Sequence, residues 1–222
     1  GCCVAKVFMI CDVVPEHSGE DDLDIVYCRN GRGCLLQFLI CLDELDPDVL
    51  IGWNLVGFDL WVLESLCKTY KLDFTIGRGR QKPHWREDDS SNRRYVSIAG
   101  RVALDGIELL KAANYRFDSF SLESVSRELL GQGKLLSGSD RGGDISELFV
   151  TDKVQLARYN LKDCELVAEI FEQEKLLEFA IERSHLTGLL LDRIGGSVAS
   201  FEYAYLPQLH RQGYVAPNLG EL

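Results

Sequence analysis

Residues 48–70 read DVLIGWNLVGFDLWVLESLCKTY and contain the change of pattern that decides the fold. The apolar run over residues 48–53 is rich in β-branched and aromatic residues, which predicts a buried strand that ends at Asn54. From there the apolar residues change to helical spacing, and we expect a helix over residues 60–70. Asp59 is therefore predicted to lie at a strand-to-helix junction, near the positive end of a helix dipole.

A second candidate carboxylate lies on a long predicted helix. Thr151 is expected to cap this helix, on which Tyr159 and Asp163 lie four residues apart and share one face. A carboxylate and a phenol on one face can bind a hard divalent cation and orient a water molecule on it. Each pattern alone favours a simpler interpretation: a helix-start aspartate at position 59, and a surface tyrosine beside a solvated aspartate on the later helix.

The two runs together resemble the second and third motifs of the DEDD superfamily of 3′→5′ exonucleases, in the version that carries tyrosine. Asn54-x-x-x-Phe58-Asp59 matches the second motif, and Tyr159-x-x-x-Asp163 matches the third. The resemblance is to the proofreading domain of family B DNA polymerases, and it extends over nearly the whole chain from Asp46 onward. Longer blocks resemble the bacterial DNA polymerase II branch: GRVALDGIELLK, SFSLESVSRELLG, YNLKDCELV and RIGGSVASFEYAYLPQLHRQGYVAPNLGE.

This resemblance implies an α/β fold, with a ribonuclease H-like mixed β-sheet flanked by helices. We expect residues 1–190 to form the exonuclease domain and residues 191–222 to form a helical link toward a polymerase palm. In the family, an opening strand carries an Asp-x-Glu first motif, and no such motif precedes Asp59 here. The nearest substitutes are poor: the first has the wrong spacing, and the second has the wrong second acid. They are Asp12-Val-Val-Pro-Glu16 and Asp22-Leu-Asp24.

The resemblance also implies a chemistry for each motif residue. Two divalent ions, Mg²⁺ or Mn²⁺, would stabilise both ends of an in-line attack by water on a phosphodiester. Asp59 and Asp163 would be ligands of different ions, and Tyr159 would orient the attacking water. Asn54 and Phe58 would contact the terminal nucleotides of a single-stranded 3′ primer end, and Phe120 would approach the strand. Two alternatives stay open: Phe58 packs in the core, and Phe120 serves as a hydrophobic staple before a helix.

The function implied is that of a DNA-directed DNA polymerase, a nucleotidyltransferase of DNA replication and repair, whose exonuclease domain removes mispaired 3′-terminal nucleotides. Because the first motif is absent, we expect the chain to be a truncated fragment that binds metal weakly and degrades DNA slowly. The alternative is a non-catalytic module that holds DNA and braces the polymerase domains of the same full-length protein.

Composition limits the other possibilities. The chain of 222 residues has a net charge of −11, which argues superficially against a DNA partner. Residues 78–101 carry a local excess of basic side chains interleaved with aromatic ones, which fits either a DNA strand path or an exposed hairpin of mixed charge. The 8 cysteines include no Cys-x-x-Cys pair and read as core residues of a protein in the reducing cytoplasm. No apolar stretch is long enough to span a membrane.

A coarse assignment orders the remaining elements. It gives several strands and helices, and a polar loop that precedes the helix carrying Tyr159. The strands are expected over residues 4–13, 24–28 and 95–104, the helices over residues 34–45, 121–131, 175–184 and 197–211, and the loop over residues 131–144. We interpret Asp105 as a turn residue and Trp53 as a core residue.

Overall fold

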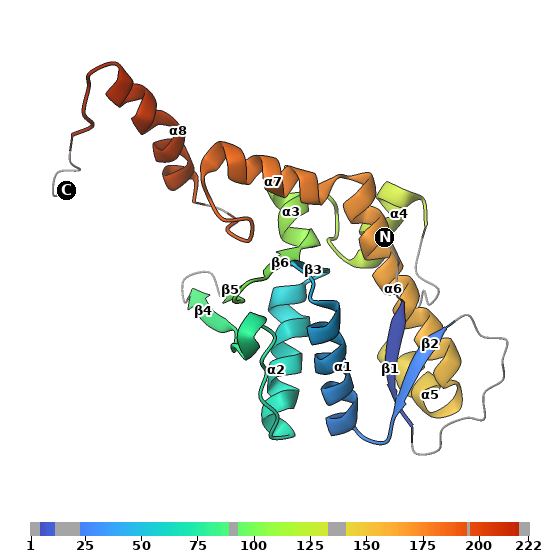
Figure 1. The fold of residues 1–222 in the computed structure, drawn as a ribbon. Helices are drawn as coiled ribbons and strands as arrows, with labels where there is room; N and C mark the ends of the chain where they lie inside the picture. The colour runs from blue at the N-terminus through green and yellow to red at the C-terminus, as the bar shows by residue number, and fades with distance from the viewer. Residues whose placement is uncertain (1–4, 12–22, 89–92, 133–140, 195, 218–222) are drawn as a thin grey trace.

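The computed structural model describes residues 5–11, 23–88, 93–132, 141–194 and 196–217. Strands and helices mix along the chain, which confirms the predicted α/β class (Figure 1). The strands are β1 Lys6–Ile10, β2 Asp24–Cys28, β3 Val49–Gly52, β4 His84–Asp88, β5 Arg93–Ser97 and β6 Val102–Asp105. The helices are α1 Gly31–Leu45, α2 Leu60–Thr69, α3 Gly106–Ala112, α4 Leu122–Leu130, α5 Arg141–Thr151, α6 Lys153–Gln173, α7 Leu176–Thr187 and α8 Ser197–Arg211.

The described strands form three two-stranded sheets. β1 pairs with β2 and β3 pairs with β6, both in parallel, while β4 and β5 form an antiparallel hairpin. In the β3–β6 pair Gly52 lies opposite Asp105, so both strands end at the same edge. β6 is followed directly by α3, and β3 is followed by helical structure after Trp53 and Asn54, because the apolar alternation of each strand changes to helical spacing there. This shared edge is where the predicted site residues of the second motif begin.

The β3–β6 pair separates two hydrophobic clusters. Val49 packs against the cluster built by α3, α4, α6 and α7, where Leu104, Leu109 and Leu166 are fully buried. Leu50, on the opposite face of the strand, packs against the cluster formed with α1 and α2. Ile51 belongs to neither cluster and is 41% exposed, and the other residues of β3 are half-buried, so the prediction that residues 48–53 form a buried strand is only partly correct.

Several predicted elements are confirmed. The strand over residues 24–28 and the helix over residues 197–211 have the expected bounds. Helix α4 begins at its predicted cap, because Ser121 Oγ accepts a hydrogen bond from the backbone N–H of Ser124. It ends at Gly131, whose φ of 66° is the left-handed conformation that terminates helices. Helix α2 ends at Thr69, close to the expected position.

Two predictions about the middle of the chain are wrong. The single strand expected over residues 95–104 is two strands, because the chain turns at Gly100, where φ is 72°. The first of these strands, β5, pairs with β4, and the second is β6. A bridge between Ile98 and Arg101 closes the turn at Gly100. The part of the expected polar loop that follows residue 140 is helical, since α5 begins at Arg141; residues 133–140 of that loop lie outside the described residues.

The start of the helix that carries Tyr159 is also corrected. Thr151 is the last residue of α5, where its hydroxyl donates to the carbonyl oxygen of Glu147. The cap of α6 is Asp152, whose Oδ1 accepts from the backbone N–H of Gln155 at 2.9 Å. The shift of one residue leaves the third motif well inside α6.

Helix α8 projects away from the rest of the molecule beyond α7 (Figure 1). It contains no buried residue, and aromatic side chains remain exposed on it, including Phe201 at 61% and Tyr205 at 47%. These two rings stack on each other with centroids 4.9 Å apart. No helix among the described residues has the length and apolar character needed to cross a membrane.

Candidate functional site

The second motif forms a tight turn between β3 and α2. Asn54 ends the strand in the left-handed conformation, with φ of 58°, and residues Leu55–Asp59 form one π-helical turn. Such π-helical turns are rare and frequent at functional sites. A Cβ at position 57 would press on the side-chain oxygen of Asn54, so a larger residue there would force that side chain to move. Asn54 therefore ends the strand, and its backbone carbonyl oxygen accepts a hydrogen bond from the N–H of Phe58 at 2.9 Å.

Asp59 lies at the first position before α2, but its carboxylate makes no capping hydrogen bond. The simpler interpretation of an ordinary helix-start aspartate is thus wrong. Burial raises the pKa of the Asp59 carboxyl; its own backbone N–H acts in the opposite direction, and the charge of Asp105 raises the pKa further. A carboxylate at the end of β3 that does not cap its helix can serve another role.

The third motif lies on α6, as expected. Tyr159 is buried at 9% exposure, and Asp163, one turn later, is half-buried with its Oδ1 shielded from solvent. The interpretation of Tyr159 as a surface tyrosine is therefore wrong. Burial raises the pKa of the neighbouring Cys164 thiol, and the charges of Asp163 and Asp59 add to this effect.

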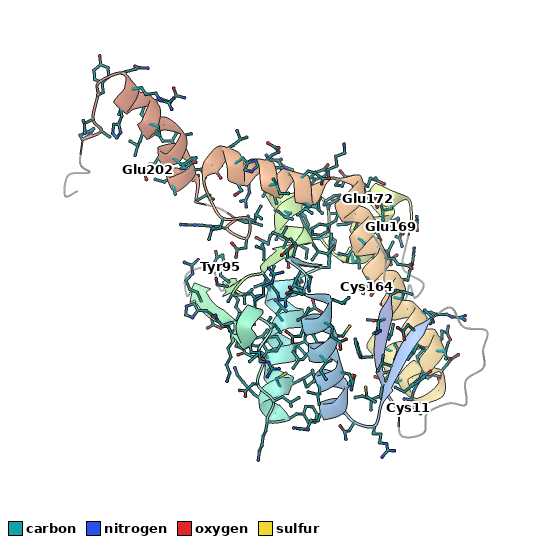
Figure 2. The ribbon with its side chains drawn as sticks, in the orientation of Figure 1. Cys11, Tyr95, Cys164, Glu169, Glu172 and Glu202 are labelled. Carbon is teal, nitrogen blue, oxygen red and sulfur yellow. The ribbon has the colours of Figure 1, made fainter. Side chains whose placement is uncertain are left out.

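Cys164 lies close enough to carboxylates of both motifs for their charges to affect its pKa. Because the charges of both Asp59 and Asp163 raise the pKa of this one thiol, the fold brings the two aspartates near Cys164 although they are far apart in sequence. Contacts between α6 and β3 are the reason, since they set the helix against the strand that precedes Asp59. Cys164, labelled on α6 in Figure 2, is exposed as a residue although its thiol is partly desolvated, which contradicts the expectation of a core cysteine.

Asp105 is a third carboxylate beside this pair, and the interpretation of it as a turn residue misses its role. Its side chain caps α3, accepting from the backbone N–H of Ile107 at 3.0 Å, and the residue is only 8% exposed. Burial raises the pKa of Asp105, against the effect of backbone N–H groups that include that of Val56 in the π-helical turn. The apolar strand VALD followed by the helical pattern GIELLK was the sequence signal for this cap.

The described side chains do not complete a two-ion metal centre. No group of three or more histidine, cysteine, aspartate or glutamate side chains suited to hold a metal ion occurs in the part of the chain that the structure describes. Asp59 and Asp163 offer hard oxygen ligands, but two carboxylates supply only part of what two divalent ions need. Of the substitutes for a first motif, Asp12, Glu16 and Asp22 lie outside the described residues, and Asp24 on β2 pairs with Lys6 at 3.5 Å.

A cleft of about 930 Å³ opens beside the carboxylates, between the β4–β5 hairpin, α3 and the loop that follows α7. Two of the predicted nucleic-acid-binding residues line it, namely Asn54 and Phe120. The residues of the acidic side, Asp59, Tyr159 and Asp163, are not among its lining residues. Asp105 lines the cleft and also acts electrostatically on Asp59, so it marks the boundary between the two sides.

Cations lie against aromatic rings on two walls of the cleft. On the hairpin, the guanidinium of Arg86 lies 4.7 Å from the centre of the Tyr95 ring, which Figure 2 labels. On the other wall, Lys111 Nζ lies 5.2 Å from the centre of the Phe120 ring. Positive groups that follow phosphates, combined with rings on which bases stack, are typical of surfaces that hold single-stranded nucleic acid.

Two of the basic residues expected along a strand path have a structural role instead. Arg101 is buried and donates to the carbonyl oxygens of Ile76, at 2.9 Å, and Pro47, at 2.6 Å. Arg78 pairs with Asp46 at 2.8 Å and with Asp48 at 2.7 Å. Hydrogen bonding from Arg78 holds the pKa of Asp46 below its usual range. The basic segment therefore divides into a structural network at its ends and a cleft-facing hairpin between them.

The two predicted aromatic contacts differ in position. Phe58 is 59% exposed, so the alternative in which it packs in the core is wrong. Phe120 packs partly against the cluster that contains Val125, as a staple would, and its ring also lines the cleft. Trp53 packs against the same cluster, in agreement with its assignment to the core.

Comparison with known proteins identifies the family. The profile described as DNA polymerase family B, exonuclease domain, matches residues 7–125. The whole chain is 44% identical to DNA polymerase II of Escherichia coli (strain K12) over 226 aligned residues, which cover 28% of that protein. It is 29% identical to the DNA polymerase delta catalytic subunit of Oryza sativa subsp. japonica over 89% of the chain, and 30% identical to that of Bos taurus over 78%.

The chain spans 28%, 19% and 17% of the lengths of these three relatives. Its α/β arrangement is consistent with the ribonuclease H-like fold that the motifs imply. The chain belongs to the family of exonuclease domains of family B DNA polymerases.

Proposed function

We propose that this chain supplies the strand-binding cleft and two of the metal ligands of a 3′→5′ exonuclease within a family B DNA polymerase. The observation that carries the proposal is that α6, which carries Asp163, packs against β3, the strand that precedes Asp59; the charges of both aspartates also raise the pKa of Cys164. Neither acid is engaged in helix capping, and both present oxygen ligands of the kind that Mg²⁺ or Mn²⁺ prefers. When bound, such ions stabilise charge on the attacking and leaving oxygens of a phosphodiester.

The side chains of this chain have separate tasks in the proposal. Asp59 and Asp163 would each be a ligand of a different metal ion. Tyr159, one turn from Asp163, orients the water that attacks the terminal phosphodiester. Asn54, Phe58 and Phe120 receive the last nucleotides of the strand. The terminal nucleotide leaves as a monophosphate, and the shortened strand keeps its 3′ hydroxyl.

The DNA partner is a single-stranded 3′ primer end, and the polymerase domains of a longer protein are the second partner. The exposed rings of α8 support residues 191–222 as the link toward those domains, after an exonuclease domain over residues 1–190. Replication and repair of bacterial DNA would place the protein in the cytoplasm. Six free cysteines among the described residues are compatible with that reducing compartment.

The experiment uses a single-stranded oligonucleotide with a fluorophore at its 5′ end. The chain is expected to bind it and, in Mg²⁺ or Mn²⁺, to shorten it slowly from the 3′ end, one nucleotide at a time. EDTA is expected to stop the shortening but not the binding.

The incomplete ligand set of the described residues favours one competing function, a module that holds DNA without cutting it. Strand binding with no shortening in either metal, together with no binding of Mn²⁺ detectable by electron paramagnetic resonance, would support that module against the exonuclease. Absence of strand binding would contradict both.

A further inference from the structure

Trp53 connects two of the predicted nucleotide-contacting residues. It follows β3 directly and precedes Asn54, and its indole Nε1–H donates to the carbonyl oxygen of Phe120 at 2.9 Å. The two residues of this hydrogen bond lie 67 positions apart in sequence. The bond therefore fixes the end of the strand that precedes Asn54 against the segment that carries the Phe120 ring.

The indole ring also fills the space at the start of α3. A Cβ added to Gly106 would approach Trp53 Cε3 to 2.9 Å and Phe171 Cε2 to 3.1 Å. Gly106 follows Asp105, the cap of α3 whose charge acts on Asp59. Trp53 thus contacts both the start of α3 and the cluster that includes Phe171 of α6.

Phe120 lies outside any helix or strand, so no regular backbone hydrogen bonding fixes its position. It precedes Ser121, the cap of α4, and lies in a segment between α3 and α4. Its ring meets Phe117 edge to face at 5.3 Å and lies under Lys111 at the cleft. The hydrogen bond from Trp53 ties the backbone of this segment to the end of β3.

We infer that Trp53 is a positioning residue of the exonuclease site. It sets the separation between the Phe120 ring and the Asn54–Asp59 turn, so that a strand end stacked on Phe120 reaches the carboxylate of Asp59. This inference rests on the proposed function, in which Phe120 receives the strand. Trp53 itself touches neither the strand nor the reacting atoms.

The test compares Trp53→Phe with Trp85→Phe in the 222-residue chain. Trp85 is the matched control, because its indole Nε1 is buried and donates to no acceptor among the described residues. Both substitutions shrink a bicyclic ring, but only the first removes a hydrogen bond between distant segments. Benzothienylalanine at position 53 is a second variant that keeps the bicyclic shape and lacks the N–H donor.

Amide hydrogen exchange provides the readout that is independent of DNA. Both variants at position 53 are expected to exchange about fivefold faster over residues 119–122 and 54–59, the size expected for loss of one neutral hydrogen bond. Trp85→Phe is expected to leave both segments unchanged. Unchanged exchange over residues 119–122 and 54–59 in the benzothienylalanine variant would overturn the inference, whatever the result for DNA.

Strand binding provides the second readout, by fluorescence anisotropy of a labelled single strand. Trp53→Phe is expected to weaken binding about fivefold, and to weaken it no further in a chain that already carries Phe120→Ala. Additive losses in that double variant would overturn the inference, since Trp53 would then act without Phe120. If the unmodified chain binds no strand, the proposed function fails, while hydrogen exchange still decides whether Trp53 positions these segments.

Discussion

The acidic side of the site and the neighbouring cleft differ in chemistry, although both are built on the ends of β3 and β6. The acidic side presents Asp59 and Asp163, whose charges converge on Cys164. The cleft presents cations stacked on rings, such as Arg86 on Tyr95. Because one side suits a divalent cation and the other suits phosphates and bases, cutting and holding are expected to be separable by substitution.

The largest expected effect is on the acidic side. Asp59→Asn and Asp163→Asn should each reduce metal-dependent shortening of a labelled strand on the order of a hundredfold or more, because each removes a carboxylate that we propose as a ligand of a hard cation. Strand affinity should stay the same or rise, since a negative charge near the phosphates is lost. Gel analysis of shortening and anisotropy of binding measure the two effects separately. A parallel loss of binding in both variants would show that the two sides are not separable.

The next effect is on the cleft. The double substitution Arg86→Ala and Tyr95→Ala should weaken strand binding about tenfold or more, because stacking of one base on an aromatic ring is worth roughly 1–3 kcal/mol. Arg80→Ala is the matched control, because Arg80 belongs to the same basic segment but does not line the cleft. Binding is measured by anisotropy at one fixed salt concentration. Equal losses in the cleft variant and the control would contradict a strand path through the cleft.

A smaller effect concerns Gly106, at the start of α3 between the acidic side and the cleft. Gly106→Ala should lower the free energy of unfolding by about 1–3 kcal/mol, because the new Cβ would press on the Trp53 and Phe171 rings. Gly33→Ala in α1 is the control, since its Cβ would meet only Asn30 Oδ1 at an ordinary 3.4 Å and alanine favours a helix. Urea denaturation should therefore show a lower free energy of unfolding for Gly106→Ala and a higher one for Gly33→Ala. Equal stability of both would mean that the rings around Gly106 move aside freely.

The smallest effect is a pH dependence of stability at the ion pair between Asp46 and Arg78. Hydrogen bonding from Arg78, opposed by burial, holds the pKa of Asp46 below the value of 3.8 that an unfolded chain would have. The carboxylate therefore stabilises the fold above pH 3.8, and this contribution is lost as pH falls through the lower folded pKa. Asp46→Asn should destabilise the chain at pH 6 and differ less from the unmodified chain near pH 2. Denaturant midpoints at the two pH values measure this, and a constant difference would contradict the assignment.

The sequence predicts most of the acidic side. The second motif lies at a strand-to-helix junction and the third on a helix, because each depends on a local change of hydrophobic period that short segments display. The cap at Ser121 and the terminator Gly131 were predictable for the same reason, as both act within one helical turn.

The cleft could not be predicted in the same way. Its walls come from the hairpin, α3 and the loop after α7, and their proximity depends on tertiary packing that no local pattern records. The roles of Arg78 and Arg101 were hidden for a related reason, because their partners Asp46 and Pro47 lie far away in sequence. Helix α5 was missed because its first residues, RGGD, are typical of a loop.

The buried guanidinium of Arg101 has a consequence for the order of folding. Its acceptors on Ile76 and Pro47 lie 25 and 54 positions away, so both loops must close before the arginine is satisfied. We expect contacts of such long range to form after the transition state, in which case weakening them accelerates unfolding and leaves the folding rate nearly unchanged. The hydrogen bonds of Arg101 would then form late in folding and slow the unfolding of the native chain.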